Sequence, residues 1–369
     1  MQVNGNHFRS IWLADAKPEV LVIDQTLLPF AFEIRTLDTV SETALAIRNM
    51  VVRGAPLIGA TAACGLYLAA ATDSSEANLH DAYQELLSSR PTAVNLRWAL
   101  DRMLPPLLAE PKSTRAKFAR TLAQQICDED VATNSAIGDH GLSLISKAAS
   151  SSPNRPVNIL THCNAGWLAT VDWGTALAPI FKAHDAGIPV HVWVDETRPR
   201  NQGASLTAWE LGAHGVGHTV IADNAGGHLM QQGEIDLCIV GSDRTTRTGD
   251  VCNKIGTYLK ALAAHDNGIP FYAALPSSTI DWTIRDGIRE IPIEERSAEE
   301  VSHISGYDNE AGKLARVRII PESSSAANPA FDVTPRKYVG GIITERGIAE
   351  ASEKGLVALF PREAESRTV

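Results

Sequence analysis

The stretch DLCIVGSDRTTRTGDVCNKIGT, residues 236–257, indicates the fold class most directly. Its apolar run, residues 237–240, is continuous rather than alternating, which is typical of a strand buried on both faces of a parallel sheet. Asp243 stands where this strand ends, and a polar loop leads to Asn253 and Lys254 at the predicted start of a helix. In open parallel sheets, ligands bind beyond the carboxyl ends of the strands, so this strand end is a candidate binding site.

Further apolar runs alternate with helical patterns through the second part of the chain. The runs span residues 157–162, 188–196, 218–223, 269–276, 315–320 and 340–345. Helices are predicted at about residues 174–187, 203–213, 224–232, 254–266 and 347–355. This alternation predicts an α/β fold whose C-terminal part is a Rossmann-like open parallel sheet with flanking helices. The glycine pattern GxGxxG is missing, so nothing in the sequence supports a dinucleotide cofactor.

The first part of the chain has a different pattern. Residues 1–149 are predicted to form a mostly helical N-terminal domain with a short β segment at 19–37, and residues 150–369 a catalytic α/β domain. The boundary is placed at the polar linker SSSPNRP, because the helical pattern gives way there to the alternating one. The last helical region before it, residues 112–149, is expected to break near Gly138.

The composition excludes several classes of protein. A net charge of −10 argues against a general nucleic-acid surface, although it leaves room for a local basic pocket. No apolar run reaches the roughly 20 residues that span a bilayer, and the first residues lack a signal-peptide pattern. Five scattered cysteines without a CxxC pair argue against disulfides and a zinc site. We therefore expect a cytoplasmic protein with no metal, no membrane and no nucleic-acid partner.

Polar residues that could take part in catalysis or binding follow several of the predicted strands. Cys163 comes directly after the first strand, and Gln202 lies in the polar loop that follows the second. Arg53, just before a helix rich in alanine and glycine, and Arg97 are candidate anion contacts. Each has an ordinary explanation by itself: a buried thiol that fills space, a turn residue at Asp243, a surface arginine. Because the ends of parallel strands share one edge of a sheet, the sequence predicts a crevice there for an anionic substrate.

The chain resembles the methylthioribose-1-phosphate isomerase family over nearly its whole length. The motifs that carry the resemblance are RGAPLIGA (53–60), RPTAVNLRWAL (90–100), THCNAGWLAT (161–170), ETRPRNQGASLTAWEL (196–211), DNAGG (223–227), GSDRTTRTGDVCNKIGT (241–257), PSSTID (276–281), NPAFDVTP (328–335) and GGIITERG (340–347). The resemblance implies a homodimer of methionine salvage that isomerises 5-methylthioribose 1-phosphate to 5-methylthioribulose 1-phosphate. It implies neither a metal nor an organic cofactor.

The resemblance also implies which residues form the site. Cys163 and Asp243 match the family's catalytic pair. The substrate-binding positions are Arg53, Gly54, Ala55, Arg97, Gln202, Asn253 and Lys254. Because the C1 phosphate prevents spontaneous ring opening, we expect Asp243 to start protonated and to donate its proton to the ring oxygen. Cys163 is expected to assist at C1 and C2, by proton transfer or beside a hydride shift.

Two alternatives follow from the same resemblance. The superfamily also contains ribose-1,5-bisphosphate isomerases, so the substrate could be ribose 1,5-bisphosphate or 5-deoxyribose 1-phosphate. It also contains the regulatory subunits of the translation initiation guanine-nucleotide exchange factor, which are not isomerases. The presence of both Cys163 and Asp243 favours an enzyme.

Overall fold

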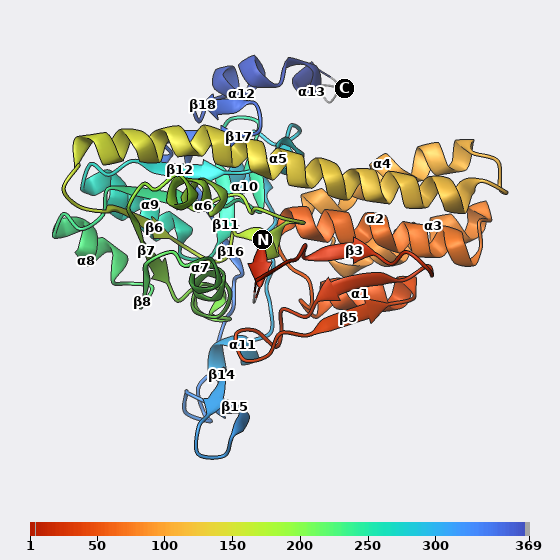
Figure 1. The fold of residues 1–369 in the computed structure, drawn as a ribbon, viewed down its shortest axis with the longest axis horizontal. Helices are drawn as coiled ribbons and strands as arrows, with labels where there is room; N and C mark the ends of the chain where they lie inside the picture. The colour runs from red at the N-terminus through yellow and green to blue at the C-terminus, as the bar shows by residue number, and fades with distance from the viewer. Residues whose placement is uncertain (4, 366–369) are drawn as a thin grey trace.

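The computed structural model describes residues 1–3 and 5–365, and its centre is a seven-stranded sheet (Figure 1). In spatial order the strands are β18 (Gly347–Ala349), β17 (Gly341–Thr344), β12 (Phe271–Ala274), β9 (Leu237–Val240), β6 (Val157–Thr161), β7 (Val190–Asp195) and β8 (His218–Ile221). All pairs are parallel except β17 with β18. The predicted α/β class with an open parallel sheet is confirmed.

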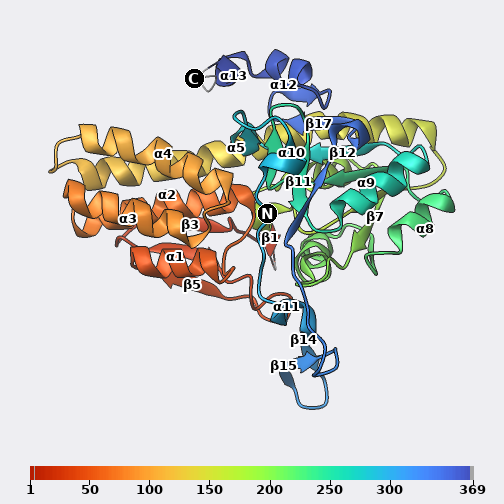
Figure 2. The same cartoon turned by 180° about the vertical axis from the view of Figure 1, so that it is seen from behind.

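Helices cover both faces of this sheet, as Figures 1 and 2 show. One face packs on α5 (Arg115–Ser151), α6 (Ala178–Asp185) and α7 (Ala208–His214), and the other on α8 (Gly226–Gln231), α9 (Thr257–Asp266) and α12 (Glu353–Leu359). In β9, Ile239 points into the first of these cores and Val240 into the second. Because both sides of the strand are buried, its sequence reads as a continuous apolar run.

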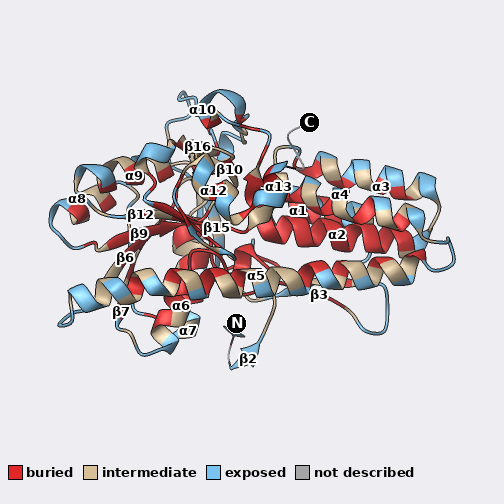
Figure 3. Ribbon diagram, turned by 90° about the horizontal axis from the view of Figure 1, so that it is seen from above, coloured by how far each residue is buried: buried red, intermediate tan, exposed pale blue. Residues whose placement is uncertain are grey.

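The N-terminal part joins a helical layer to a small antiparallel sheet. Its helices are α1 (Val40–Arg48), α2 (Ala55–Thr72), α3 (Glu76–Ser89) and α4 (Val94–Ala109). Its strands are β3 (Ile11–Leu13), β4 (Val20–Ile23) and β5 (Ile34–Leu37), with a short hairpin of β1 (Gln2–Val3) and β2 (Asn6–His7) before them. α2 is long and apolar enough to cross a membrane, but 89% of it is buried inside the protein, as in a core helix (Figure 3).

α5 runs along both parts of the molecule without the break that was expected near Gly138. Gly138 and Gly141 instead allow a close approach of α6: a Cβ on Gly141 would lie 2.9 Å from Pro179 Cβ. The two glycines therefore serve packing rather than chain reversal. α5 contacts α2 and α4 at one end and α6 at the other, so a division into domains near residue 150 stays a prediction.

A second sheet places two of the predicted site residues. It consists of β13 (Ile280–Asp281), β10 (Arg244–Thr246), β11 (Val251–Lys254) and β16 (Phe331–Thr334). Asn253 and Lys254 end β11 rather than begin a helix, and this corrects the sequence prediction. The reason is pairing across about 80 residues of sequence: Asn253 lies opposite Asp332 and Lys254 opposite Phe331. The helix, α9, begins only after Gly256.

Two other predicted elements also differ. Residues 315–320, expected in the main sheet, fall largely in β15 (Lys313–Arg318), which pairs with β14 (His303–Asp308) in a hairpin that projects from the body (Figures 1 and 2). The helix expected at residues 347–355 begins only at Glu353, since β18 precedes it and Ser352 caps it. The remaining elements are α10 (Gly287–Glu290), α11 (Glu299–Ser302), α13 (Pro361–Glu365), a π-helix at Gly203–Thr207 and 3-10 turns at Trp167–Ala169, Ser277–Thr279 and Arg336–Tyr338.

Candidate active site

Four of the predicted residues meet beyond the strand ends of the main sheet. Cys163 follows β6, Asp243 follows β9 and Lys254 ends β11, while Arg53 reaches in from the loop before α2. The charges of Arg53, Lys254 and Asp243 all act on the Cys163 thiol. The crevice predicted at this edge of the sheet therefore contains a thiol, a carboxyl and two cationic groups.

The turn that presents Cys163 is held in an unusual conformation. Its φ is 67°, in the left-handed region that side chains other than glycine seldom adopt and that costs of order 1–3 kcal/mol. The Cys163 N–H donates to Thr197 Oγ1 at 2.8 Å, and Thr207 Oγ1 donates to the Cys163 carbonyl at 2.7 Å. Burial raises the pKa of the thiol, whereas Arg53 and Lys254 act to lower it. The protein thus fixes a buried thiol at the strand end.

Asp243 has the surroundings of a carboxyl that keeps its proton. It lines a cavity of about 30 Å³ in which apolar side chains, among them Ile58 and Phe331, lie beside two arginines, Arg90 and Arg244. Burial raises the pKa of Asp243, although the positive charges of Lys254, Arg90 and Arg53 oppose the shift. A half-buried site next to cations, in which desolvation favours the neutral form, suits a group that starts neutral and becomes an anion during a reaction.

Lys254 offers a cation to the same space. Its side chain is buried, with Nζ 4.7 Å from the centroid of the Phe331 ring. Burial lowers the pKa of Lys254, while Cys163 and Asp243 act to raise it. Within residues 1–3 and 5–365, Nζ donates no hydrogen bond, so its protons are available to an anion. Asn253 is buried beside it and donates from Nδ2 to Thr257 Oγ1 at 3.0 Å.

Two of the N–H groups at the start of α9 are already bonded to a carboxylate. Asp332 accepts hydrogen bonds from Gly256 N at 2.7 Å and from Tyr258 N at 3.1 Å. This carboxylate already neutralises the positive end of the helix. A phosphate at this site would therefore be bound mainly by the side chains of Lys254 and the arginines.

Gln202 and Arg53 line a larger neighbouring cavity of about 430 Å³. This volume lies within the range of small-molecule sites. Gln202 is buried, and its Oε1 accepts no hydrogen bond from the described residues. Leu28, Met50 and Leu206 add apolar surface to the same cavity. A sugar hydroxyl could thus be bound at Gln202, with an apolar substituent close by.

Gly54 and Ala55 shape the junction between Arg53 and α2. Gly54 precedes the helix with a φ of 95°, and Ala55 is its first residue. A Cβ at Gly54 would lie 2.6 Å from Ala169 Cβ, so the loop before α2 can approach the turn after β6 only with glycine there. Arg53 is held in reach of the Cys163 turn by this approach.

We predict that Gly54→Ala lowers the free energy of unfolding by about 2–4 kcal/mol, since it adds both an unfavourable φ and an overlap with Ala169. Gly187→Ala is the matched control. Gly187 also has a positive φ, 76°, but its Cβ would meet no atom within 4 Å. The control should lose only about 1 kcal/mol. Equal losses in urea unfolding of the two variants would show that the contact with Ala169 is unimportant.

The structure does not bring Arg97 into this cluster. Arg97 is exposed on α4 and lines a separate depression with Asp101 and Asp281. Arg90, which was not among the predicted site residues, lies where Arg97 was expected. It is buried, and its charge acts on both Asp243 and Lys254. Both arginines belong to the motif RPTAVNLRWAL, and only their burial separates them.

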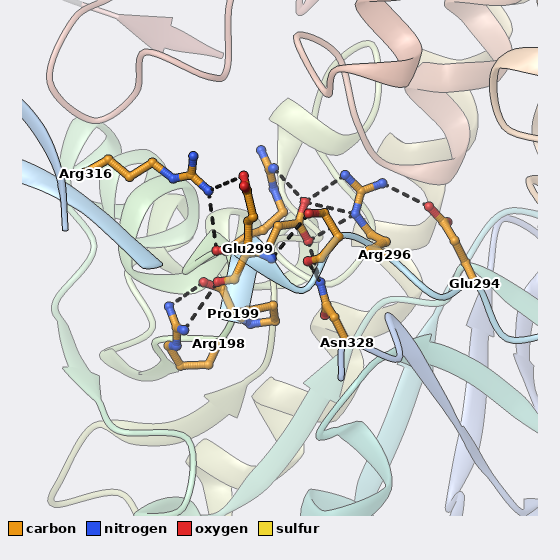
Figure 4. Close-up of polar contacts among 10 residues, drawn as sticks. Arg198, Pro199, Glu294, Arg296, Glu299, Arg316 and Asn328 are labelled. Atoms are coloured by element: carbon orange, nitrogen blue, oxygen red, sulfur yellow. Dashed lines mark hydrogen bonds and ion pairs between the residues drawn. The ribbon is translucent and has the colours of Figure 1, made fainter. Parts of the chain in front are cut away.

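A ladder of alternating charges connects Arg90 to the loop that carries Gln202. Figure 4 shows the part of it in which Glu294 pairs with Arg296. Arg90 Nη2 donates to Glu294 at 2.7 Å, and Arg296 donates to Glu294 at 2.9 Å and to Glu300 at 2.8 Å. Glu300 also accepts from Arg200 at 3.0 Å. Although burial acts to raise it, the bonds from Arg296 lower the pKa of Glu300 to about 2. The glutamates therefore stay ionised and tie the segment before α11 to the site.

One group of residues has the composition of a metal site. The ligand atoms of His162, Asp195 and Asp223 lie within 4.8 Å of one another. The ammonium of Lys260 lies among them, 3.2 Å from Asp195 Oδ2 and hydrogen-bonded to the Asp223 carbonyl. His162 Nδ1 contacts Asp195 at 2.8 Å, and its Nε2 donates to the carbonyl of Ile255 at 2.8 Å. The positive charge that these carboxylates need is supplied by the protein itself.

Comparison with known proteins places the chain among sugar-phosphate isomerases and initiation factors. The model of the Initiation factor 2 subunit family matches residues 51–351. A Methylthioribose-1-phosphate isomerase of Methylorubrum extorquens is 63% identical over 361 residues, which cover 98% of each chain. A Methylthioribose-1-phosphate isomerase of Acidiphilium cryptum is 63% identical over 365 residues, 99% of each chain.

Two solved structures have the same fold. The 5-methylthioribose 1-phosphate isomerase of Pyrococcus horikoshii superposes with a TM-score of 0.81 at 42% identity and covers 96% of both chains. The translation initiation factor eIF-2B subunit delta of A. fulgidus superposes with a TM-score of 0.79 at 37% identity, over 96% of this chain and all of the other. Fold similarity by itself therefore does not separate an isomerase from an initiation-factor subunit.

Proposed function

The chain belongs to the Initiation factor 2 subunit family, and we propose that within it the protein is an isomerase that converts 5-methylthioribose 1-phosphate to 5-methylthioribulose 1-phosphate in methionine salvage. Full-length identities above 60% to methylthioribose-1-phosphate isomerases support this activity. The observation that carries it is the meeting of Cys163, Asp243 and Lys254 beyond the strand ends. These groups provide the acid, the thiol and the cation that the reaction needs.

The substrate sets the chemical problem. Its anomeric oxygen carries the phosphate, so the furanose ring cannot open spontaneously as that of a free sugar does. The bond between C1 and the ring oxygen must break, the ring oxygen must gain a proton, and a hydrogen must move from C2 to C1. The C2 hydroxyl loses its proton and becomes the ketone, which balances the proton gained by the ring oxygen, and the phosphate stays on C1.

Asp243 is proposed as the acid that protonates the ring oxygen. This role requires a carboxyl that is neutral before the reaction, and the burial that raises the pKa of Asp243 favours that form. As the proton leaves, the new carboxylate is stabilised by the nearby cations of Lys254, Arg90 and Arg53. The same cations are available to the substrate phosphate.

Cys163 is proposed to act at C1 and C2. As a thiolate it would accept the C2 proton, and Arg53 and Lys254 both favour that form. In a hydride shift the thiol would instead stabilise the charge that develops at C1. Solvent deuterium at C1 of the product supports proton transfer, while complete transfer of the C2 hydrogen supports the hydride route or a base shielded from water.

We predict that Lys254→Ala raises KM about 10- to 100-fold with a smaller change in kcat, because the buried ammonium is proposed to bind the phosphate throughout the reaction. Lys354→Ala, which removes an exposed lysine on α12, is the control and should leave both constants unchanged. An unchanged KM in the Lys254 variant would exclude a phosphate role for this residue.

The substituent at C5 decides between the alternative substrates. The large cavity has two arginines besides Arg53, but Arg200 is paired with Glu300 and Arg316 with Glu299. Neutralised arginines beside apolar side chains favour a methylthio group over a second phosphate. We expect the highest kcat/KM with 5-methylthioribose 1-phosphate, a moderately lower value with 5-deoxyribose 1-phosphate, and little turnover of ribose 1,5-bisphosphate. No ketose from any of the three would refute an isomerase function.

We further propose a cytoplasmic homodimer. Support comes from the projecting hairpin and the first residue after it, where large apolar side chains are 47–53% exposed: Tyr307, Leu314, Val317 and Ile319. Such a strip favours a protein contact. Light scattering should give about twice the chain mass of 39.6 kDa, and the mass of a single chain would contradict the proposal.

A further inference from the structure

Asn164 holds the guanidinium of Arg53 by two hydrogen bonds. Arg53 Nη1 donates to the side-chain oxygen of Asn164 at 2.5 Å, and Nη2 donates to its carbonyl at 2.8 Å. Both bonds leave the remaining N–H groups of the guanidinium for an anion. Asn164 is buried and directly follows Cys163, so one turn carries the thiol and fixes the arginine.

Asn164 is in turn held by a buried carboxylate on α7. Asn164 Nδ2 donates to Glu210 Oε1 at 2.8 Å. Two backbone N–H groups complete the set of donors to Glu210: Trp167 N donates to Oε2 at 2.8 Å and Leu168 N to Oε1 at 3.1 Å. Glu210 is only 1% exposed. A side chain that is buried so completely and accepts three N–H groups fixes the whole turn after β6.

The surroundings of Glu210 favour a side chain that only accepts hydrogen bonds, and they leave little room for it. A Cβ on Gly166 would overlap the Glu210 carboxylate, so glycine at this position makes room for it. All three donors are N–H groups, and a glutamine would turn an N–H group of its own toward one of them. Burial raises the pKa of Glu210 to about 7, opposed by these hydrogen bonds and by the charge of Arg53. The three N–H donors thus favour the carboxylate of Glu210, whereas burial favours its neutral form.

We propose that Asn164 and Glu210 are positioning residues that hold Arg53 in the orientation needed to bind the substrate phosphate. The inference rests on the proposed function, in which Arg53 contacts that phosphate. Glu210 fixes Asn164, Asn164 fixes the guanidinium, and neither touches the substrate. Because Asn164 adjoins Cys163, the relay also sets the distance between the bound phosphate and the thiol.

The test is a double-mutant cycle on KM for 5-methylthioribose 1-phosphate. Glu210→Gln should raise KM about tenfold, the effect of weakening one hydrogen bond to a charged group, with kcat within about threefold of wild type. Arg53→Ala should raise KM more. If Glu210 acts through Arg53, the double variant should equal Arg53→Ala alone. If the increases in KM of the two single variants multiply in the double variant, or if KM is unchanged in Glu210→Gln, the proposal is overturned.

Asp130→Asn is the control for loss of a carboxyl whose pKa is raised by desolvation. Burial raises the pKa of Asp130 to about 7 as well, and this carboxyl accepts the N–H of Val171 at 2.7 Å. It contacts none of the residues of the relay that the structure describes, so KM should stay within about twofold. A rise equal to that of Glu210→Gln would attribute the effect to general loosening of the fold, against the proposal.

A second variant keeps the test decisive if Glu210→Gln does not fold. Asn164→Ala removes the side-chain bond to Arg53 but retains Glu210 with its two backbone donors. It should raise KM about tenfold and should likewise have no effect in the Arg53→Ala background. Calorimetric binding of inorganic phosphate provides the same cycle without turnover. Wild-type protein that binds phosphate but forms no ketose refutes the proposed function, whereas additive losses of phosphate affinity refute the relay.

Discussion

Asp243→Asn is expected to lower kcat on 5-methylthioribose 1-phosphate by about 100-fold or more while leaving KM within about threefold. An amide has the shape of the carboxyl but cannot give up a proton to the ring oxygen, and a well-placed general acid contributes about 10²- to 10⁴-fold. Asp130→Asn, which removes another half-buried carboxyl whose pKa is raised by desolvation, should retain wild-type turnover. Turnover near wild type in Asp243→Asn would exclude this residue as the acid.

The pH dependence of kcat is a second test of Asp243 as the acid. The acid acts in its protonated form, so kcat should fall as pH rises through the pKa of Asp243. Since burial raises that pKa, the fall in kcat should come at higher pH than an ordinary aspartate would give, and it should be missing in Asp243→Asn.

The raised pKa of Asp243 also affects folding stability, because the folded state binds the proton more tightly than the unfolded state does. Folding stability should therefore decrease as pH rises from the ordinary pKa to the raised one.

Cys163→Ser is expected to lower kcat by about 100-fold or more as well. A hydroxyl is similar in size, so the turn held by Thr197 and Thr207 should persist, but it is a far weaker acid than a thiol and does not form an anion at neutral pH. Cys238→Ser is the control, because that thiol is buried within β9 and faces the sheet core. Equal losses in the two serine variants, measured per folded protein, would remove Cys163 from the mechanism.

The sequence predicted the elements that depend on local pattern. The continuous apolar run of β9 indicated a strand covered on both faces, and Asp243 was placed correctly at its end. Polar loops after β6 and β7 gave Cys163 and Gln202. These residues could be found because the ends of parallel strands share one edge of the sheet wherever the strands lie in the sequence.

The errors came from long-range contacts, which a local pattern does not contain. Lys254 looked like the start of a helix because its strand partner, β16, lies some 80 residues later. Arg97 and Arg90 share one motif, and only the packing of Arg90 under Glu294 shows which of them faces Asp243. Glu210 had no distinguishing neighbour in the sequence: the residues that require it, Asn164 and Gly166, belong to another strand end.

The central claim is that this crevice moves a hydrogen from C2 to C1 of a C1-phosphorylated sugar without releasing the phosphate. NMR of purified protein with [1-¹³C]5-methylthioribose 1-phosphate tests it in a single time course. An isomerase should replace the anomeric C1 signal by that of a phosphorylated CH₂ carbon, with no inorganic phosphate in the ³¹P spectrum. An unchanged anomeric signal, or release of inorganic phosphate, would contradict the central claim.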